Sequence, residues 1–180
     1  MAFVNQVSTT NFVPQKLKVL KVLCQDCFQE MGTTAFPGLA VGIDLPVADL
    51  DLLVFDVEAG IPTVPNITVL PNKVLNTISV PLTVTVTLLG VEVLTLDIPG
   101  FFITGEIVCS GIVPDGTVNV QKHDLQVLEP IVPVVADFTV VDGLITELTL
   151  LITVIVEGCA VISREEILKV NAASLFCPCP

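Results

Sequence analysis

The strongest constraint on the fold is a strict two-residue alternation in the middle of the chain. From Leu82 to Leu89 the sequence reads LTVTVTLL, so threonines and aliphatic residues occupy alternate positions. Successive side chains of a β-strand point to opposite faces, and this pattern therefore predicts a strand with one apolar face. Other segments with strand character are Leu39–Val57, Val91–Ile98, Phe101–Val113, Thr117–Gln121, Leu125–Leu128, Val134–Val141, Leu144–Val156 and Ala160–Val170.

Turn residues separate these segments. Pro114-Asp115-Gly116 ends one of them, and Asp142-Gly143 is a strong hairpin signal. Eight or more strands at short spacing predict an all-β fold, either an antiparallel β-sandwich or a jelly roll. Leu144–Val156 is almost entirely apolar, so we expect it in the centre of a sheet.

The length of 180 residues suits one domain with flanking arms. We divide it into an N-terminal arm or linker at residues 1–37, which carries Cys24 and Cys27, a β-sandwich body at residues 38–170, and a C-terminal Cys-Pro-Cys-Pro tail at residues 171–180.

Two segments are ambiguous between strand and helix. Lys16–Leu23 reads KLKVLKVL, and it fits either a strand or the start of a helix that continues to Gly32. The abundance of β patterns elsewhere favours the strand. Ser163-Arg164-Glu165-Glu166 has the form of a capping box, which predicts the start of a short helix.

The six cysteines are unevenly distributed: Cys24 and Cys27 come early, and Cys177 and Cys179 lie in the last four residues. Thiols near both ends are well placed to link subunits, so we favour intersubunit disulfides. Four thiolates also suit a tetrahedral zinc site, whereas a redox role needs a βαβ setting, and inert thiols remain open. The other two, Cys109 and Cys159, fall within strands and are interpreted as buried thiols or an intrachain bridge.

Composition limits the classes of partner. Hydrophobic residues make up 52% of the chain and charged residues 14%, whereas about 25% of a typical soluble domain is charged. So few charges favour the burial of apolar surface between subunits. The net charge of −12 argues against nucleic acid, whose phosphates need Lys and Arg. We expect no nucleic-acid partner, no membrane span, no cofactor and no stoichiometric metal.

The opening residues, MAFVNQVSTTNFVPQ, lack a basic region and an uninterrupted apolar segment, so we expect no secretory signal. Cysteines arranged for oxidation are unusual in a chain made in the reducing cytosol. Synthesis in the cytosol followed by an extracellular location after the producing cell lyses would reconcile the two, and it is the location that we expect; structural zinc or redox chemistry is the other explanation.

Groups suited to catalysis are scarce. His123 is the only histidine, in a predicted charged turn, and the chain has no Tyr and no Gly-x-Ser-x-Gly motif. Asp49 and Asp51 share a strand face, but no calcium-binding loop surrounds them, which favours a solvated acidic face. The sequence predicts a protein that is not an enzyme.

The segment Met1–Val13 mixes polar and apolar side chains and has no hairpin partner of its own. We expect this arm to add a strand to a neighbouring subunit or to cover its sheet edge. Phe3, Val7 and Phe12 are the predicted apolar anchors. Head-to-tail contacts of this kind propagate as open filaments, so the main predicted partner is a second copy of the chain.

Two segments resemble the strand-rich domains of spore-coat assembly proteins: Gly105-Glu106-Ile107-Val108 through Pro114, and Glu157-Gly158-Cys159 through Val170. The chain is also similar to structural proteins of the Gram-positive endospore surface, namely coat, exosporium and spore-appendage subunits. Spore-appendage pilins carry cysteines on an N-terminal arm that reaches a neighbour, although Cys24 and Cys27 lie further inside this chain.

The resemblance implies a self-assembling subunit that is made in the mother cell without a signal peptide. It would be exposed on the spore surface when that cell lyses, cross-linked by disulfides and associated with other spore-surface proteins. The alternatives are a phage tail or capsid β-protein, and a monomeric or zinc-stabilised binding module.

Overall fold

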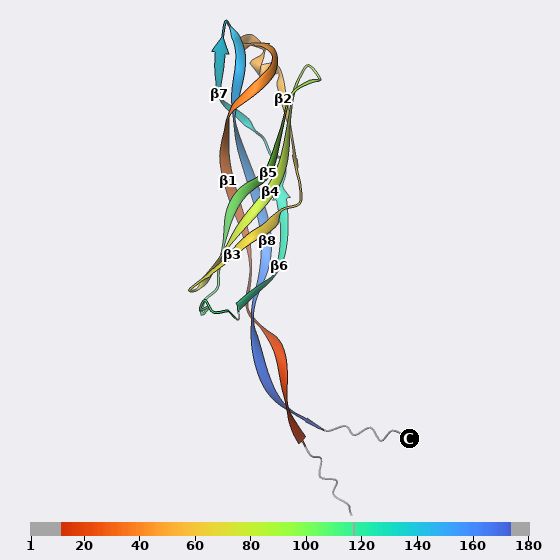
Figure 1. Cartoon of the computed structure of the whole chain (residues 1–180), viewed down its shortest axis with the longest axis vertical. Coiled ribbons are helices and arrows are strands. Elements are labelled where there is room, and N and C mark those ends of the chain that lie inside the picture. Colours follow the sequence, from red (N-terminus) through yellow and green to blue (C-terminus); the bar gives the residue numbers. More distant parts are fainter. Residues whose placement is uncertain (1–11, 117, 174–180) are drawn as a thin grey trace, which may run out of the picture.

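Two antiparallel sheets pack face to face in the computed structural model, which describes residues 12–116 and 118–173 (Figure 1). The elements are β1 (Phe12–Pro46), the 3-10 helix η1 (Val47–Leu52), β2 (Leu53–Ala59), β3 (Thr63–Leu70), β4 (Lys73–Leu88), β5 (Val91–Val108), β6 (Val118–Leu128), β7 (Val134–Val141) and β8 (Leu144–Ala173). One sheet has the order β1-β8-β6, with β7 also paired with β8. The other has the order β2-β4-β3, with β5 paired with β4. The predicted β-sandwich is confirmed.

The central strands, β4 and β8, supply most of the core. Along β4 every second side chain is buried, and the threonines between them face outward, as the alternation predicts. Burying a single Val or Ile contributes about 1.5–3 kcal/mol, so this stripe is a main source of stability. The predicted central position of Leu144–Val156 is also confirmed, because its strand pairs with β1 on one side and with β6 and β7 on the other.

Three local predictions are wrong. The predicted strand Leu39–Val57 is interrupted by η1, so Asp49 and Asp51 lie in this 3-10 helix and do not share a strand face. Two other segments are strands where we predicted a helix and a turn. Ser163-Arg164-Glu165-Glu166 belongs to strand β8, because Ser163 is flanked by Val22 of β1 and Asn119 of β6, and a helix would leave both strands without a partner. The predicted turn around His123 lies inside strand β6, where His123 pairs with Ala160. In both places sheet pairing outweighs the local polar pattern.

Strand β1 extends the first sheet well into the predicted arm. It is a strand throughout Phe12–Pro46, which confirms the strand interpretation of Lys16–Leu23, and it crosses the boundary that we placed at residue 37. Phe12 and Val13 pair with Ala173 and Ala172 of the same chain. These two residues therefore have a backbone partner of their own, which corrects the prediction of an unpaired arm, whereas Phe3 and Val7 lie outside the described residues.

One aromatic ring, that of Phe28, packs between the two sheets. Phe28 of β1 lies opposite Gly158 of β8 and is 9% exposed. A Cβ at Gly158 would lie 3.0 Å from the Phe28 ring and 2.5 Å from the side chain of Leu125. A Cβ at Gly105, in the opposite sheet, would lie 3.1 Å from the same ring. The ring thus occupies space that both glycines leave open.

Replacing Gly158 by alanine should lower the free energy of unfolding by about 1–3 kcal/mol, because the added methyl group overpacks the site between Phe28 and Leu125. Denaturant unfolding of the purified protein measures this. Gly116→Ala is the matched control, since nothing lies within 4 Å of a Cβ at that position. Equal stability of the two variants would show that the Phe28 site has room to relax.

Candidate functional site

Two disulfides within the chain replace the predicted links between subunits. Cys24 is bonded to Cys109, and Cys27 is bonded to Cys159. Cys24 and Cys27 are therefore not available to a neighbouring chain in this structure, and that part of the sequence prediction is wrong. The interpretation of Cys109 and Cys159 as intrachain cysteines is confirmed, although their partners differ from the predicted one. Cys177 and Cys179 lie outside the described residues.

The physical reason is the strand geometry of β1. Residues three apart on a strand point to opposite faces. Cys24 accordingly packs against the core, where it reaches Cys109, which is 1% exposed. Cys109 directly follows β5 of the opposite sheet and does not lie within the strand, which corrects our prediction. Cys27 points outward and meets Cys159, its direct neighbour on β8. The two thiols of this motif are thus separated by the sheet, which also excludes them as a shared zinc-binding pair.

The Cys27–Cys159 bond lies beside a surface depression of about 740 Å³, which is also lined by Asp124, Gln126 and Glu157. Gln126 donates a hydrogen bond to the Glu157 carboxylate. Cysteines that react by thiol exchange lie next to positive charge, because cations stabilise the thiolate. Carboxylates beside this bond have the opposite effect, so the surroundings favour a structural disulfide over a reactive one.

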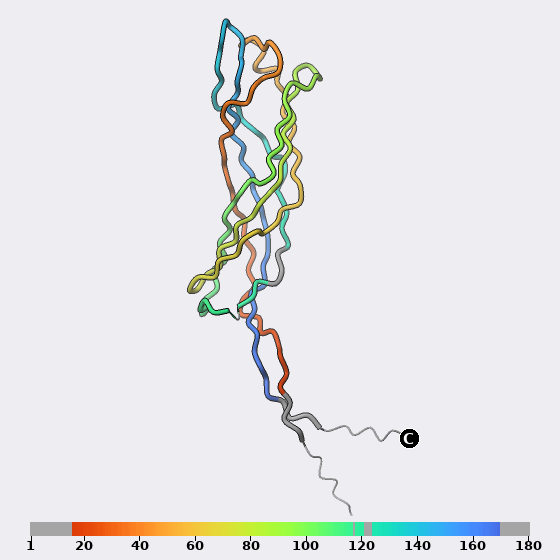
Figure 2. The backbone as a smooth tube through the Cα atoms, in the orientation of Figure 1, coloured from red at the N-terminus to blue at the C-terminus, as the bar shows by residue number. Residues whose placement is uncertain are grey.

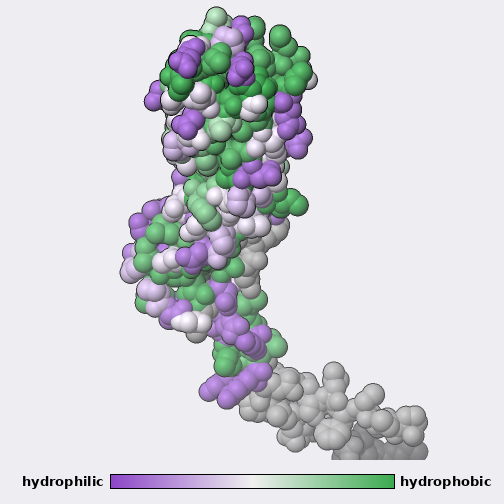
Figure 3. Space-filling view, turned by 45° about the horizontal axis from the view of Figure 1, so that its top comes forward, coloured by the Kyte–Doolittle hydropathy of each residue, from purple (hydrophilic) through white to green (hydrophobic). Residues whose placement is uncertain are grey.

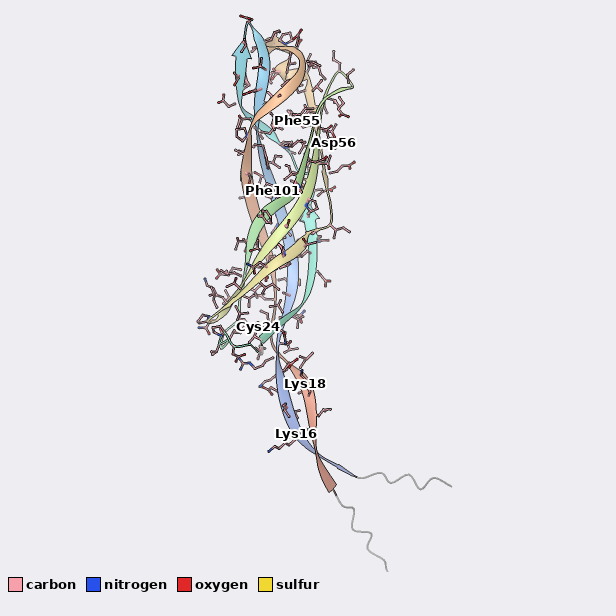
Figure 4. The ribbon with its side chains drawn as sticks, in the orientation of Figure 1. Lys16, Lys18, Cys24, Phe55, Asp56 and Phe101 are labelled. Carbon is pink, nitrogen blue, oxygen red and sulfur yellow. A yellow bond between two sulfur atoms is a disulfide. The ribbon has the colours of Figure 1, made fainter. Side chains whose placement is uncertain are left out.

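The second notable feature is a two-stranded ribbon that projects from the sandwich (Figures 1 and 2). We define the ribbon as Phe12–Val22 of β1 together with Ser163–Ala173 of β8, which pair residue by residue. The next strand, β6, reaches only as far as Arg164, so the described residues provide no third strand beyond that point. Figure 4 shows Cys24 where the ribbon leaves the body, with Lys18 and Lys16 further along it.

Ion pairs cross the ribbon and connect its base to the body. The Nζ of Lys18 lies 2.7 Å from Oε2 of Glu165, and the Nζ of Lys21 lies 3.1 Å from Oε1 of Glu166. Each pair therefore joins β1 to β8. Arg164 lies 3.2 Å from Asp115 in the loop after β5, which ties the base of the ribbon to the body. Exposed pairs of this kind contribute only about 0.2–1 kcal/mol each.

The ribbon also exposes apolar side chains to solvent. Leu17 is 51% exposed and Ile167 is 67% exposed. Leu20, Val22 and Leu168 are exposed as well. A two-stranded β structure is marginally stable in water unless a further strand or another body covers one face. The ribbon is therefore a surface that would gain stability if another strand or another molecule covered it.

Within residues 12–116 and 118–173, no group of three or more His, Cys, Asp or Glu side chains has the arrangement of a metal site. No helix in these residues is long and apolar enough to cross a membrane.

Comparison of the chain with models of known protein families, with curated proteins and with solved structures found no match.

Proposed function

We propose that this protein is a self-assembling structural subunit of an extracellular filament or layer. The observation that supports it most is the ribbon, because its apolar side chains lie outside the sandwich and no third strand among residues 12–116 and 118–173 covers them. A surface of this kind gains stability when a second molecule covers it. The resemblance to endospore-surface proteins supplies the location within this proposal, which is the spore surface after lysis of the mother cell.

The two disulfides support an oxidising final location. Disulfides persist in extracellular and cell-surface proteins, whereas cytosolic thiols are kept reduced. One bond joins the two sheets and the other joins neighbouring strands of one sheet. A subunit stapled in this way keeps its shape outside the cell, as a surface layer requires.

Sedimentation velocity of the purified, oxidised chain over a range of concentrations tests self-assembly. We expect the mean sedimentation coefficient to rise steeply with concentration, because each subunit offers a surface that another subunit covers. A sedimentation coefficient that stays at the value of one 19.1 kDa chain would contradict the proposed function.

A covalent link between subunits is expected at the C-terminal tail. Since four cysteines are paired within the chain, Cys177 and Cys179 are left to bond the tail of a neighbour. Assembled protein boiled in detergent should give bands above 19.1 kDa, which collapse to one band when a reductant is added. The Cys177→Ser/Cys179→Ser variant should give the single band without reductant. If the native protein does so too, the tails do not cross-link.

A further inference from the structure

Charge is segregated along the long axis of the molecule. The ribbon carries five of the seven Lys and Arg residues and only two acids, Glu165 and Glu166. At the opposite end of the sandwich lie residues 38–52, 88–92 and 134–147, which we call the distal end (Figure 1). The distal end contains no Lys or Arg and seven acids, which are Asp44, Asp49, Asp51, Glu92, Asp137, Asp142 and Glu147. One end is basic and the other is acidic.

The distal end also exposes apolar side chains, as the surface turned forward in Figure 3 shows. Val47 at the start of η1 and Leu89 in the β4–β5 turn are exposed, the latter by 80%. The ribbon and the distal end therefore share one property, exposed apolar surface, and differ in the sign of their charge. Two such surfaces can bind each other, because their apolar side chains can be buried together and their opposite charges attract.

A depression of about 680 Å³ lies at the distal end, between the end of β1 and the β7–β8 hairpin. Its walls combine apolar side chains with two carboxylates: Val41, Ile43, Asp44, Val141, Asp142 and Leu144. Clefts of roughly 300–1,000 Å³ are large enough to hold bound groups. The depression thus has room for side chains of a neighbouring molecule.

The ribbon has a matching pair of cations. Lys16 and Lys169 lie directly opposite each other in the register of β1 and β8, and both are exposed. Like charges opposite each other in a sheet are destabilising. Unlike Lys18 and Lys21, neither of these lysines has an ion-pair partner among the described residues. Ile167 lies two residues from Lys169, and therefore on the same face of the ribbon, and it is 67% exposed.

We propose that the ribbon of one subunit lies over the distal depression of a second copy. Lys16 and Lys169 then face Asp44 and Asp142, while Ile167, on the same face of the ribbon, covers the apolar walls. The contact joins two different surfaces, so it leaves one ribbon and one depression free and propagates as an open chain of subunits. It rests on the proposed function, because it specifies how that assembly is built.

Charge reversal tests this contact. The ribbon variant is Lys16→Glu/Lys169→Glu, which keeps a like-charge pair at the same position and so leaves the repulsion within the ribbon similar. The depression variant is Asp44→Lys/Asp142→Asn, where asparagine is chosen because residue 142 has a φ of 52° that Asn tolerates. Asp56→Lys/Glu58→Gln is the control, since it makes the same charge change on exposed positions of β2.

Each variant is studied by sedimentation velocity, with circular dichroism as the check on folding. We expect the ribbon and depression variants alone to associate at least tenfold more weakly than the native chain, and the β2 control to associate as the native chain does. An equimolar mixture of the two variants should recover association, because every ribbon then finds a depression of opposite charge. Added salt should weaken the native contact.

The outcomes separate this contact from the proposed function. If the native chain associates and both variants associate equally well, the ribbon does not bind the distal depression, and self-assembly uses another surface. Loss of association in both variants without recovery in the mixture would also overturn the contact, because the charges would then act within each chain. A native chain that stays monomeric overturns the contact and the proposed function together.

Discussion

Replacing Cys24 and Cys109 together by alanine should lower the free energy of unfolding by about 2–5 kcal/mol. Their bond spans 85 residues and joins β1 of one sheet to the residue that follows β5 of the other, so its loss frees the unfolded chain and removes a covalent link across the core. Because Cys109 is buried, its truncation adds a small cavity. Small domains are stable by only about 5–15 kcal/mol in total, so the effect is a large share. Guanidinium unfolding monitored by circular dichroism measures it.

The second disulfide, between Cys27 and Cys159, provides the comparison. That bond lies at the outer face of one sheet, with Cys27 exposed, so we expect a mild reductant to open it before the buried Cys24–Cys109 bond. Thiol labelling during reduction gives the order. Two reactive thiols at Cys24 and Cys109 in the oxidised native protein, or unchanged stability of the first variant, would contradict the pairing.

Replacing Phe28 by alanine should lower the free energy of unfolding by about 3–5 kcal/mol, which is the usual loss for large aromatic residues in well-packed cores. The ring occupies the space between Gly158 of its own sheet and Gly105 of the other, and neither glycine has a side chain that fills the resulting cavity. The midpoint of denaturant unfolding gives the loss.

Phe102→Ala is the matched control for this truncation, because it removes the same ring at a position that is 63% exposed. We expect that change to stay within about 0.5 kcal/mol, which is usual for surface substitutions. Similar losses for the two phenylalanines would show that the ring of Phe28 has no special role between the sheets.

The fold was accessible from sequence where the pattern is local. The alternation of Leu82–Leu89 and the near-continuous apolar run of Leu144–Val156 predict two central strands, and the structure confirms both. The hairpin at Asp142-Gly143 is likewise present, with a positive φ at both residues. These features depend on the two-residue period of strands and on turn chemistry, which short segments carry in full.

The cysteine pairing was not accessible in the same way. Once residues 24–27 are placed on a strand, their spacing shows that the two thiols face opposite sides, and this signal argues against a shared site. It does not show which strands lie beyond each face. Cys109 and Cys159 are brought to Cys24 and Cys27 by sheet packing and by register over 85 and 132 residues of sequence.

The ribbon and the distal depression depend on tertiary structure too. KLKVLKVL has the composition of a strand inside the sandwich, and nothing local in it shows that β6, the strand on the other side of β8, begins only at Val118. The depression joins Asp44 to Asp142 only because the end of β1 pairs with the start of β8. The sequence does show that Lys and Arg are unevenly distributed along the chain. The fold places most of them in the ribbon and leaves the distal end with acids only, so the two ends have opposite charge.

Electron microscopy of the negatively stained native chain tests self-assembly most directly. The protein is purified without reductant, so that its disulfides stay intact, and is held at low ionic strength, where attraction between oppositely charged ends is strongest. We expect ordered filaments or sheets built from one repeating, elongated subunit. Single particles of the size of one sandwich at every concentration would contradict the assignment of this chain as a structural subunit.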